Sequence, residues 1–237
     1  MLALIGDIHG EFGRLPKILS QIPKDAIILQ VGDFGWWPGL QPVYLRARAA
    51  VGYDFHIRFI EGNHDHVRLV GECNKAAEES TESWRDWPGA EYVPRGSVLE
   101  LDGKRILFMG GANSLDRRWR PHNFGPHAWF DEEEVTEEDV MRAVANVIEG
   151  DEDDSRGIDL IVAHTPPDSV IRSNFSEDGL RMFDIDPRKW VDRSARNVEA
   201  LWRSLGKPPL WCGHMHRSVV DGPVRILGIN EVGFFDG

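Results

Sequence analysis

Short apolar runs rich in β-branched residues recur along the chain, and each one ends at a polar or glycine-rich segment. Runs of this length and composition are typical of strands that are buried on both faces. We therefore predict strands over these ranges: Leu2–Ile5, Ala26–Val31, His56–Ile60, Arg105–Met109, Ile158–Ala163, Leu210–Cys212 and Val224–Ile229. The dipeptide Asp102-Gly103 predicts a β-hairpin that joins residues 97–101 to residues 104–109.

Two segments between the predicted strands have the periodicity of amphipathic helices. Each places four apolar residues on one helical face: Val140, Val144, Val147 and Ile148 in the first, and Val198, Leu201, Trp202 and Leu205 in the second. Thr136 and Asp139 have the spacing of a capping box before the first helix, and Gly206 stands where the second should end. Alternating strands and helices indicate a layered α/β protein, and a chain of 237 residues favours a single domain over residues 1–237.

Two long segments, 110–131 and 165–191, show neither strand nor helix periodicity. Loops of this length in a compact domain are usually functional or disordered. The first segment is unusually rich in basic, histidine and tryptophan side chains: Arg117, Arg118, Trp119, Arg120, His122, His127 and Trp129. Because disordered segments are poor in aromatic residues, we interpret it as an ordered rim over a functional site.

The acidic charge of the protein is concentrated in one segment. The net charge is −12, and residues 131–154 contribute −11 of it, which leaves −1 for the remainder of the chain. We interpret this segment as a solvated helix with an acidic start, followed by an exposed loop. The chain has no broad basic face of the kind that grips duplex DNA, so we expect a small anionic substrate and no stable duplex nucleic-acid binding.

The cysteine usage and the hydropathy bear on the compartment. Cys73 and Cys212 lie far apart in the sequence and form no metal or redox spacing, which is typical of a reducing cytoplasm, and Cys212 is expected to fill the core. The N-terminus has no basic region, and the short apolar run Met1–Ile5 leads directly into Gly6 and Asp7, so we expect no signal peptide. No apolar run approaches the roughly 20 residues that a membrane helix needs. We therefore expect a cytoplasmic protein that does not associate with membranes.

Polar side chains follow five of the predicted strands. The segments are Gly6-Asp7-Ile8-His9-Gly10, Gly32-Asp33, Gly62-Asn63-His64-Asp65, His164-Thr165-Pro166-Pro167 and Gly213-His214-Met215-His216. Each alone is explained as well by a turn, a helix cap or a satisfied core histidine. Together they deliver Asp, Asn and His to the strand ends, where open α/β sheets carry their sites. Mixed imidazole, carboxylate and amide ligands suit manganese, iron, zinc or nickel better than calcium.

The order of these motifs, from Asp7 to His216, resembles the calcineurin-like metallophosphoesterase superfamily. The resemblance implies a two-sheet β-sandwich flanked by α-helices in four layers. It also implies two metal-ligand groups that share the bridging residue Asp33: Asp7, His9 and His216 for one ion, and Asn63, His164 and His214 for the other. His64 would protonate the leaving oxygen or steady the phosphate. Asp65 would either orient His64 or cap a helix behind it, and we favour the cap.

The activity that the resemblance implies is phosphoester hydrolysis by two divalent transition-metal ions, with manganese favoured, whose bridging hydroxide attacks phosphorus. Trp36 and Trp37 stand where the protein phosphatases and their diadenosine-tetraphosphatase relatives carry Asp and Arg, and Asp65 stands where those enzymes usually have Glu. The final His-Met-His block is more similar to the phosphodiesterase branches. We therefore expect phosphodiesters as substrates, most plausibly nucleotides, cyclic ones included. The alternatives are a broad phosphomonoesterase, a nuclease on short or single-stranded nucleic acid and, least expected, a non-catalytic scaffold.

Residues 110–117 are also similar to small phage and bacterial members of the superfamily. One hypothesis is that Arg117 or Arg118 binds the substrate phosphate with its bidentate fork, while Trp36, Trp37 or Trp119 stacks on a base. The alternative is that the arginines pair with the acidic segment and the tryptophans pack in the core. The sequence favours neither.

Overall fold

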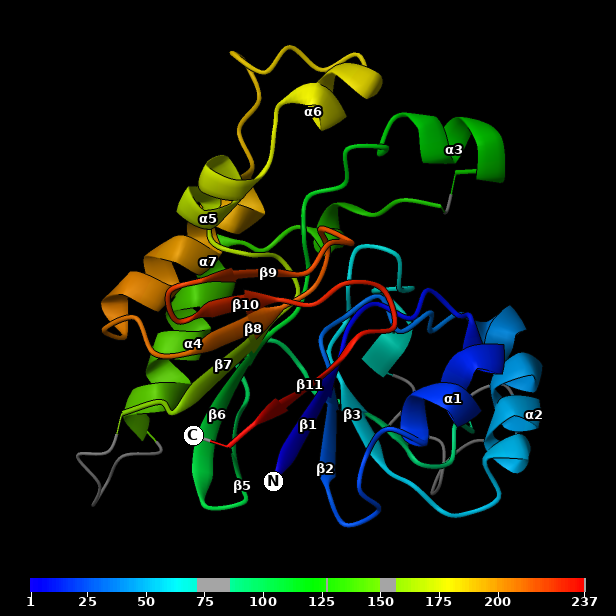
Figure 1. Ribbon diagram of the computed structural model, residues 1–237. Helices are drawn as coiled ribbons and strands as arrows, with labels where there is room; N and C mark the ends of the chain where they lie inside the picture. Colours follow the sequence, from blue (N-terminus) through cyan, green and yellow to red (C-terminus); the bar gives the residue numbers. More distant parts are fainter. Residues whose placement is uncertain (72–85, 127, 150–156, 237) are drawn as a thin grey trace.

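The computed structural model describes residues 1–71, 86–126, 128–149 and 157–236. Two β-sheets pack face to face and carry helices on their outer sides (Figure 1). The first sheet has the order β11-β1-β2-β3-β4: Val232–Phe235, Leu2–Ile5, Ile27–Gln30, Ile57–Phe59 and Ala90–Tyr92. The second has the order β5-β6-β7-β8-β10-β9: Val98–Leu101, Lys104–Met109, Leu160–Ala163, Leu210–Cys212, Val224–Ile226 and Val219–Asp221.

The helices fall into three groups. The first covers the outer face of the first sheet: η1 (Phe12–Arg14), α1 (Leu15–Leu19), η2 (Pro38–Leu40) and α2 (Gln41–Val51). The second covers the second sheet: α4 (Glu137–Glu149) and α7 (Arg193–Ser204). The remaining elements belong to the two long segments and their borders: α3 (Trp119–Phe124), η5 (Asp131–Glu133), α5 (Asp168–Asn174) and α6 (Asp178–Met182).

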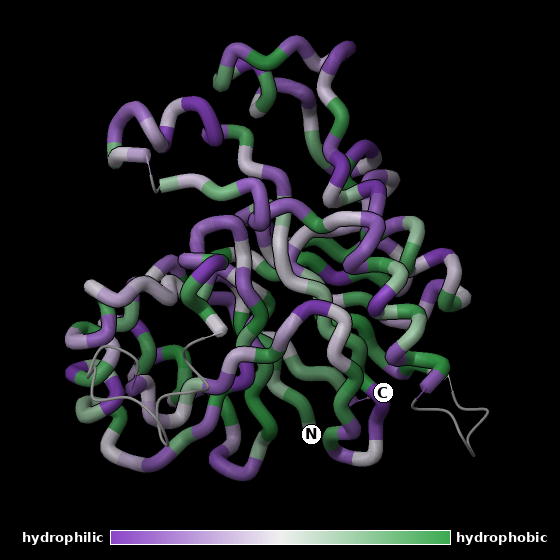
Figure 2. Tube along the Cα trace, turned by 180° about the vertical axis from the view of Figure 1, so that it is seen from behind, coloured by the Kyte–Doolittle hydropathy of each residue, from purple (hydrophilic) through white to green (hydrophobic). Residues whose placement is uncertain are grey.

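The apolar strands are buried on both faces because alternate side chains enter different cores. In β1, Leu2 and Leu4 pack between the two sheets, whereas Ala3 and Ile5 pack under the helices of the first sheet. In β6, Ile106 and Phe108 pack between the two sheets, whereas Leu107 and Met109 pack on the side of α4 and α7. In Figure 2 the hydrophobic segments of the tube, coloured green, accordingly lie mostly in the interior. The predicted four-layer arrangement of helices, two sheets and helices is confirmed.

Several elements form where local signals in the chain predict them. Residues 97–101 and 104–109 form the predicted antiparallel hairpin, with positive φ angles of 54° at Asp102 and 70° at Gly103. The capping box before α4 is present, because Thr136 N donates to Asp139 Oδ2 at 2.9 Å and Asp139 N donates to Thr136 Oγ1 at 3.2 Å. Ile148 is an exception: its side chain is 65% exposed, so the prediction that it faces the core is wrong.

The parallel strands of each sheet end at the same edge of the molecule. β1 and β2 are aligned from Leu2 opposite Ile27 to Ile5 opposite Gln30, and β6 and β7 end together at Met109 and Ala163. The loops that follow these strands therefore meet at one edge, with α3, α5 and α6 beyond it (Figure 1). No helix in the described part of the chain is both long and apolar enough to cross a membrane.

A buried guanidinium ties the end of β3 to the acidic segment. Arg95 pairs with Glu61, which directly precedes Gly62, and both side chains are almost inaccessible. Its other nitrogens donate to the main-chain oxygens of Glu132 at 2.7 Å and Glu134 at 2.9 Å, and lie 3.3 Å from the carboxylate of Asp139. The interpretation of residues 131–154 as simply solvated is therefore wrong for this part; residues 150–154 lie outside the described residues.

We expect Arg95→Met to lower the free energy of unfolding by about 3–5 kcal/mol, because it leaves the buried Glu61 carboxylate without its counter-charge. Urea unfolding measures the change. Arg68→Met is the matched control: Arg68 pairs with Glu132 on the surface, where solvent and salt screen the interaction. A loss for Arg95→Met no greater than that for Arg68→Met would contradict this account.

Candidate metal centre

The loops after β1 and β2 are joined through their backbones. The main-chain oxygen of Asp33 accepts hydrogen bonds from Ile8 N at 3.0 Å and His9 N at 2.7 Å. His9 and Asp33 have positive φ angles of 50° and 54°, a left-handed conformation that costs a non-glycine residue roughly 1–3 kcal/mol. His214 and His216 share this feature, at 67° and 55°. Four of the seven predicted ligands thus stand on strained backbone that the surrounding contacts must hold in place.

Three motif glycines are explained by close approach of a predicted ligand. A Cβ atom at Gly62 would overlap the carboxylate of Asp33, and one at Gly213 would overlap that of Asp7. At Gly32 it would overlap the ring of His164. Because only glycine lacks the Cβ atom, these positions allow side chains from separate strands to reach one another.

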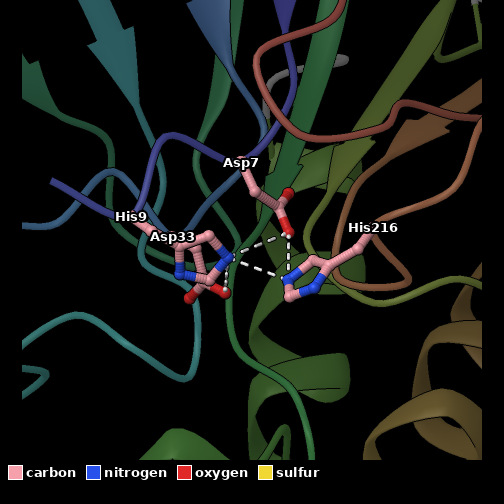
Figure 3. Close-up of side chains that lie close together, drawn as sticks. All are labelled: Asp7, His9, Asp33 and His216. Carbon is pink, nitrogen blue, oxygen red and sulfur yellow. Dashed lines mark hydrogen bonds and ion pairs between the residues drawn. The ribbon is translucent and has the colours of Figure 1, made fainter. Parts of the chain in front are cut away.

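One group of ligand atoms lies after β1, β2 and β8. The Nε2 atom of His9 is 2.8 Å from His216 Nε2, 3.6 Å from Asp33 Oδ2 and 3.8 Å from Asp7 Oδ2 (Figure 3). His216 Nε2 is also 3.3 Å from Asp7 Oδ2. An ion with ligand distances of about 2.1 Å holds its ligand atoms within about 4.2 Å of one another. These separations therefore suit one shared ion.

Three further predicted ligands also gather near Asp33. His164 Nε2 is 3.1 Å from Asn63 Oδ1 and 3.4 Å from Asp33 Oδ2, and the ring centroids of His164 and His214 are 5.2 Å apart. His164 Nδ1 lies 2.8 Å from the main-chain oxygen of Val31, which can only accept, so Nδ1 donates. A metal-binding histidine characteristically donates its second nitrogen to a carbonyl in this way, so Nε2 can bind an ion once its own proton has left.

The charges of the site are strongly coupled. Burial opposes ionisation of both Asp33 and His164, but their mutual attraction prevails: it raises the pKa of His164 to about 9 and holds the pKa of Asp33 well below its usual range. Burial lowers the pKa of His214 to about 3, so its ring is neutral. The hydrogen bond to Asp7 raises the pKa of His216.

The donor set fits divalent transition-metal ions. Asp33 Oδ2 is buried and accepts no well-aligned hydrogen bond from the described residues; its ion-pair contacts are with His9 and His164, at 3.6 and 3.4 Å. A buried carboxylate oxygen without a donor is costly unless a cation binds it. Four imidazoles, two carboxylates and one amide are the ligands that manganese, iron, zinc and nickel accept.

His64 lies at the edge of this site. Its backbone N–H donates to Asp33 Oδ1 at 2.7 Å, and its ring centroid is 5.2 Å from that of His9. The ring is partly exposed and forms one wall of a pocket with Trp37, whose Nε1 donates to the main-chain oxygen of His64 at 2.7 Å. His64 is thus beside the predicted ligands and open to a substrate.

Asp65 has a different environment from the one predicted. Its carboxylate accepts hydrogen bonds from the backbone N–H groups of residues 34–36 and Gly62, at 2.7–3.2 Å. Burial and the neighbouring Asp33 raise the pKa of Asp65 to about 7, and these N–H groups oppose the rise. Residues 67–69 form a turn and residues 70–71 begin a 3-10 helix, but the hydrogen bonds to the Asp65 carboxylate come from residues 34–36 and Gly62 instead. Asp65 joins the loops after β2 and β3, and we assign it a positioning role.

The predicted substrate contacts are corrected in part. Trp36 is fully buried, because it packs in the core with Trp87, and cannot stack on a base. Arg117 pairs with Glu134 at 3.0 Å and lies over the ring of Trp190, which matches the alternative interpretation that it pairs with the acidic segment. Arg118 is exposed at the start of α3.

A buried network next to Asn63 was missed by the sequence analysis. Arg120 is 5% exposed, and its Nη1 donates to the main-chain oxygen of Asn63 at 2.8 Å. Its Nη2 donates to Glu133 Oε2 at 2.6 Å, and Ser114 Oγ donates to the same oxygen at 2.8 Å. Burial raises the pKa of Glu133 to about 7, and Arg120 opposes the rise. Arg120 lies in the basic segment 110–131, but nothing local in the sequence distinguishes it from Arg117.

Asp and His side chains gathered at the strand ends of a two-sheet sandwich are the arrangement expected of a metal-dependent hydrolase. The chain belongs to the calcineurin-like phosphoesterase family, whose model matches residues 1–218. It is therefore a metal-dependent phosphoesterase, and the predicted superfamily is confirmed. A search of curated proteins gave no match.

We expect Gly213→Ala to weaken Mn²⁺ binding at least about tenfold, because its Cβ atom would displace the Asp7 carboxylate. Isothermal titration of the metal-free protein measures the dissociation constant. Gly39→Ala is the control, since no atom lies within 4 Å of a Cβ placed there. Equal Mn²⁺ affinity in the two variants would show that the close approach at Gly213 does not matter.

Proposed function

We propose that the protein hydrolyses phosphodiesters, nucleotides in particular, with two divalent ions that share Asp33. The observation that carries the proposal is the position of Asp33 Oδ2, which lies 3.6 Å from His9 Nε2 in one ligand group and 3.4 Å from His164 Nε2 in the other. An oxygen between two ligand groups, without a hydrogen-bond donor among the described residues, is suited to bridge two cations.

The ligands would be divided as the family resemblance implies. Asp7, His9 and His216 would hold one ion, and Asn63, His164 and His214 the other. The ions, with manganese favoured, would activate a water as the nucleophile and neutralise the phosphoryl oxygens. His64 is partly exposed beside Asp33 and would protonate the leaving oxygen. Asp65 and Arg120 would hold the loops that carry Asp33 and Asn63.

A pocket beside His64 supports an aromatic substituent on the substrate. Its volume is about 440 Å³, and its lining is mostly apolar: Trp37, His64, Asp116, Trp119, Arg120, Phe124 and Ala128. Trp119 and Phe124 are 51% and 70% exposed, and their rings lie edge to face with centroids 5.2 Å apart. Exposed aromatic side chains are suited to stack on a base. Trp37 and Trp119 thus take the role that Trp36 cannot, and Arg118 remains a proposed phosphate contact.

Other features of the chain are compatible with a small substrate. The net charge of −12 disfavours a long polyanion, and short or single-stranded nucleic acid is the nearest alternative substrate. The two cysteines, far apart in the sequence, support a cytoplasmic location.

We expect the metal-free protein to be inactive on bis-p-nitrophenyl phosphate and to recover activity with Mn²⁺. Asp33→Asn should lower kcat/KM more than about a thousandfold, because it removes the shared charge. His64→Ala should lower kcat about a hundredfold or more with a nucleoside leaving group, and less with p-nitrophenolate, which leaves without a proton. The metal content of the His64→Ala variant should equal that of the wild type.

The substrate panel also contains p-nitrophenyl phosphate and single-stranded DNA. Faster turnover of the diester than of the monoester or DNA agrees with the proposal. Robust monoester turnover without diester turnover would overturn the preference for diesters. Metal-loaded protein that turns over none of them would contradict the hydrolase itself.

We expect Phe124→Ala to raise the KM for thymidine 5′-(p-nitrophenyl phosphate) about tenfold, because loss of one stacking partner costs about 1–3 kcal/mol. The KM for methyl p-nitrophenyl phosphate, which has no base, should change little. Phe183→Ala is the control, since Phe183 is an exposed aromatic residue outside the pocket lining. Unchanged KM values for both substrates would reject the pocket as a base-binding site.

A further inference from the structure

The loop after β6 brings one hydroxyl group into contact with the amide of Asn63. Ser114 is 1% exposed, and its Oγ lies 3.0 Å from Asn63 Nδ2. The same oxygen is 2.8 Å from Glu133 Oε2 and accepts a short hydrogen bond from Arg120 Nη2. A buried serine with three polar partners is fully committed, because a hydroxyl has one proton and two lone pairs.

The direction of each hydrogen bond at Ser114 follows from its charged neighbours. A guanidinium can only donate, so Arg120 occupies one lone pair of Ser114 Oγ. Glu133 acts as an acceptor, because Oε1 receives the N–H of Phe130 at 3.2 Å and Oε2 receives Arg120 at 2.6 Å. The single proton of Ser114 therefore goes to Glu133. The lone pair that remains can accept only from an N–H group, and Asn63 must present its NH₂ to it.

This polarity determines what Asn63 presents on its other side. With Nδ2 bound to Ser114, the amide oxygen Oδ1 points to His164 Nε2 at 3.1 Å, into the second ligand group. An amide binds a cation only through its oxygen, so a rotated amide would turn its N–H groups towards the ion. Arg120 holds the backbone of Asn63 through its carbonyl, and Ser114 is the partner that holds the nitrogen of the amide.

We propose that Ser114 is a positioning residue that fixes the amide of Asn63 with its oxygen towards the second metal ion, through a hydrogen-bond chain from Glu133 to Ser114 to Asn63. This inference rests on the proposed two-ion function. Arg120 and Glu133 set the direction of the chain, and Ser114 transmits it to the ligand. The loop is anchored independently, because Ser194 N donates to Asn113 Oδ1 at 3.1 Å.

Isothermal titration of metal-free protein with Mn²⁺ tests the proposal. The titration is done at pH 8, where Glu133, with its pKa of about 7, is ionised. We expect the wild type to bind two ions and Ser114→Ala to bind the second at least about tenfold more weakly. Ser194→Ala is the matched control: its hydroxyl is equally buried and accepts from Val135 N at 2.9 Å, and the substitution keeps the main-chain N–H that anchors Asn113. It should lower thermal stability without changing either Mn²⁺ affinity.

A double-mutant comparison separates orientation from a general structural effect. In the Asn63→Asp background both terminal atoms of residue 63 are oxygens, so rotation has no consequence. Ser114→Ala should then weaken the second ion less than about twofold. Unchanged Mn²⁺ affinity in the single variant would overturn the proposal, and so would an equal loss in both backgrounds. A wild type that binds only one ion would contradict the two-ion function and, with it, this inference; two ions with an unchanged Ser114→Ala variant would contradict the inference alone.

Discussion

The carboxylate of Asp33 is the group on which the rest of the site depends. The main-chain oxygen of Asp33 holds the loop after β1, and its side-chain Oδ1 holds the loop after β3. Its Oδ2 lies 3.6 Å from His9 Nε2 and 3.4 Å from His164 Nε2. It is fully buried on left-handed backbone with a φ of 54°. Such a residue is unfavourable in an isolated chain, because both its charge and its conformation cost free energy. The surrounding structure is arranged so that this cost is offset.

Two kinds of interaction provide that support. The apolar strands supply most of the stability, because side chains on both of their faces enter packed cores. Buried polar networks then fix the loops at the strand ends: Asp65 holds the loop after β2, Arg95 holds Glu61, and Arg120 holds Asn63. Ligands held by rigid strands and satisfied hydrogen bonds stay within the narrow geometry that metal binding requires. The glycines at 32, 62 and 213 remove the remaining steric barriers.

Much of this could be predicted from the sequence because the signals were local. The apolar runs gave the central strands, Asp102-Gly103 gave the hairpin, and the spacing of Thr136 and Asp139 gave the capping box. The order of the Asp, Asn and His motifs indicated the family, which the family model confirms. The assignment of individual ligands remains a prediction that the geometry supports.

What the sequence could not provide depends on contacts between distant residues. β4, β9 and β11 were not predicted. β4 and β9 are strands of three residues with no fully buried side chain, and β11 forms by pairing with β1 from the other end of the chain. Trp36 and Trp37 are adjacent, yet one lies in the core and the other lines the pocket. Arg120 and Arg117 differ in the same way: only the three-dimensional fold brings Arg120 to Asn63 and Arg117 to Glu134. Asp65 is bound by amides of another loop, a contact without any local signal.

The most direct test of the account is the number and place of the bound ions. Crystals grown with Mn²⁺ should be measured at a wavelength where manganese scatters anomalously. The account predicts two anomalous peaks on either side of Asp33 Oδ2, one beside His9 and His216 and one beside Asn63 and His164. A single peak, or two peaks that do not share Asp33, would contradict the central claim.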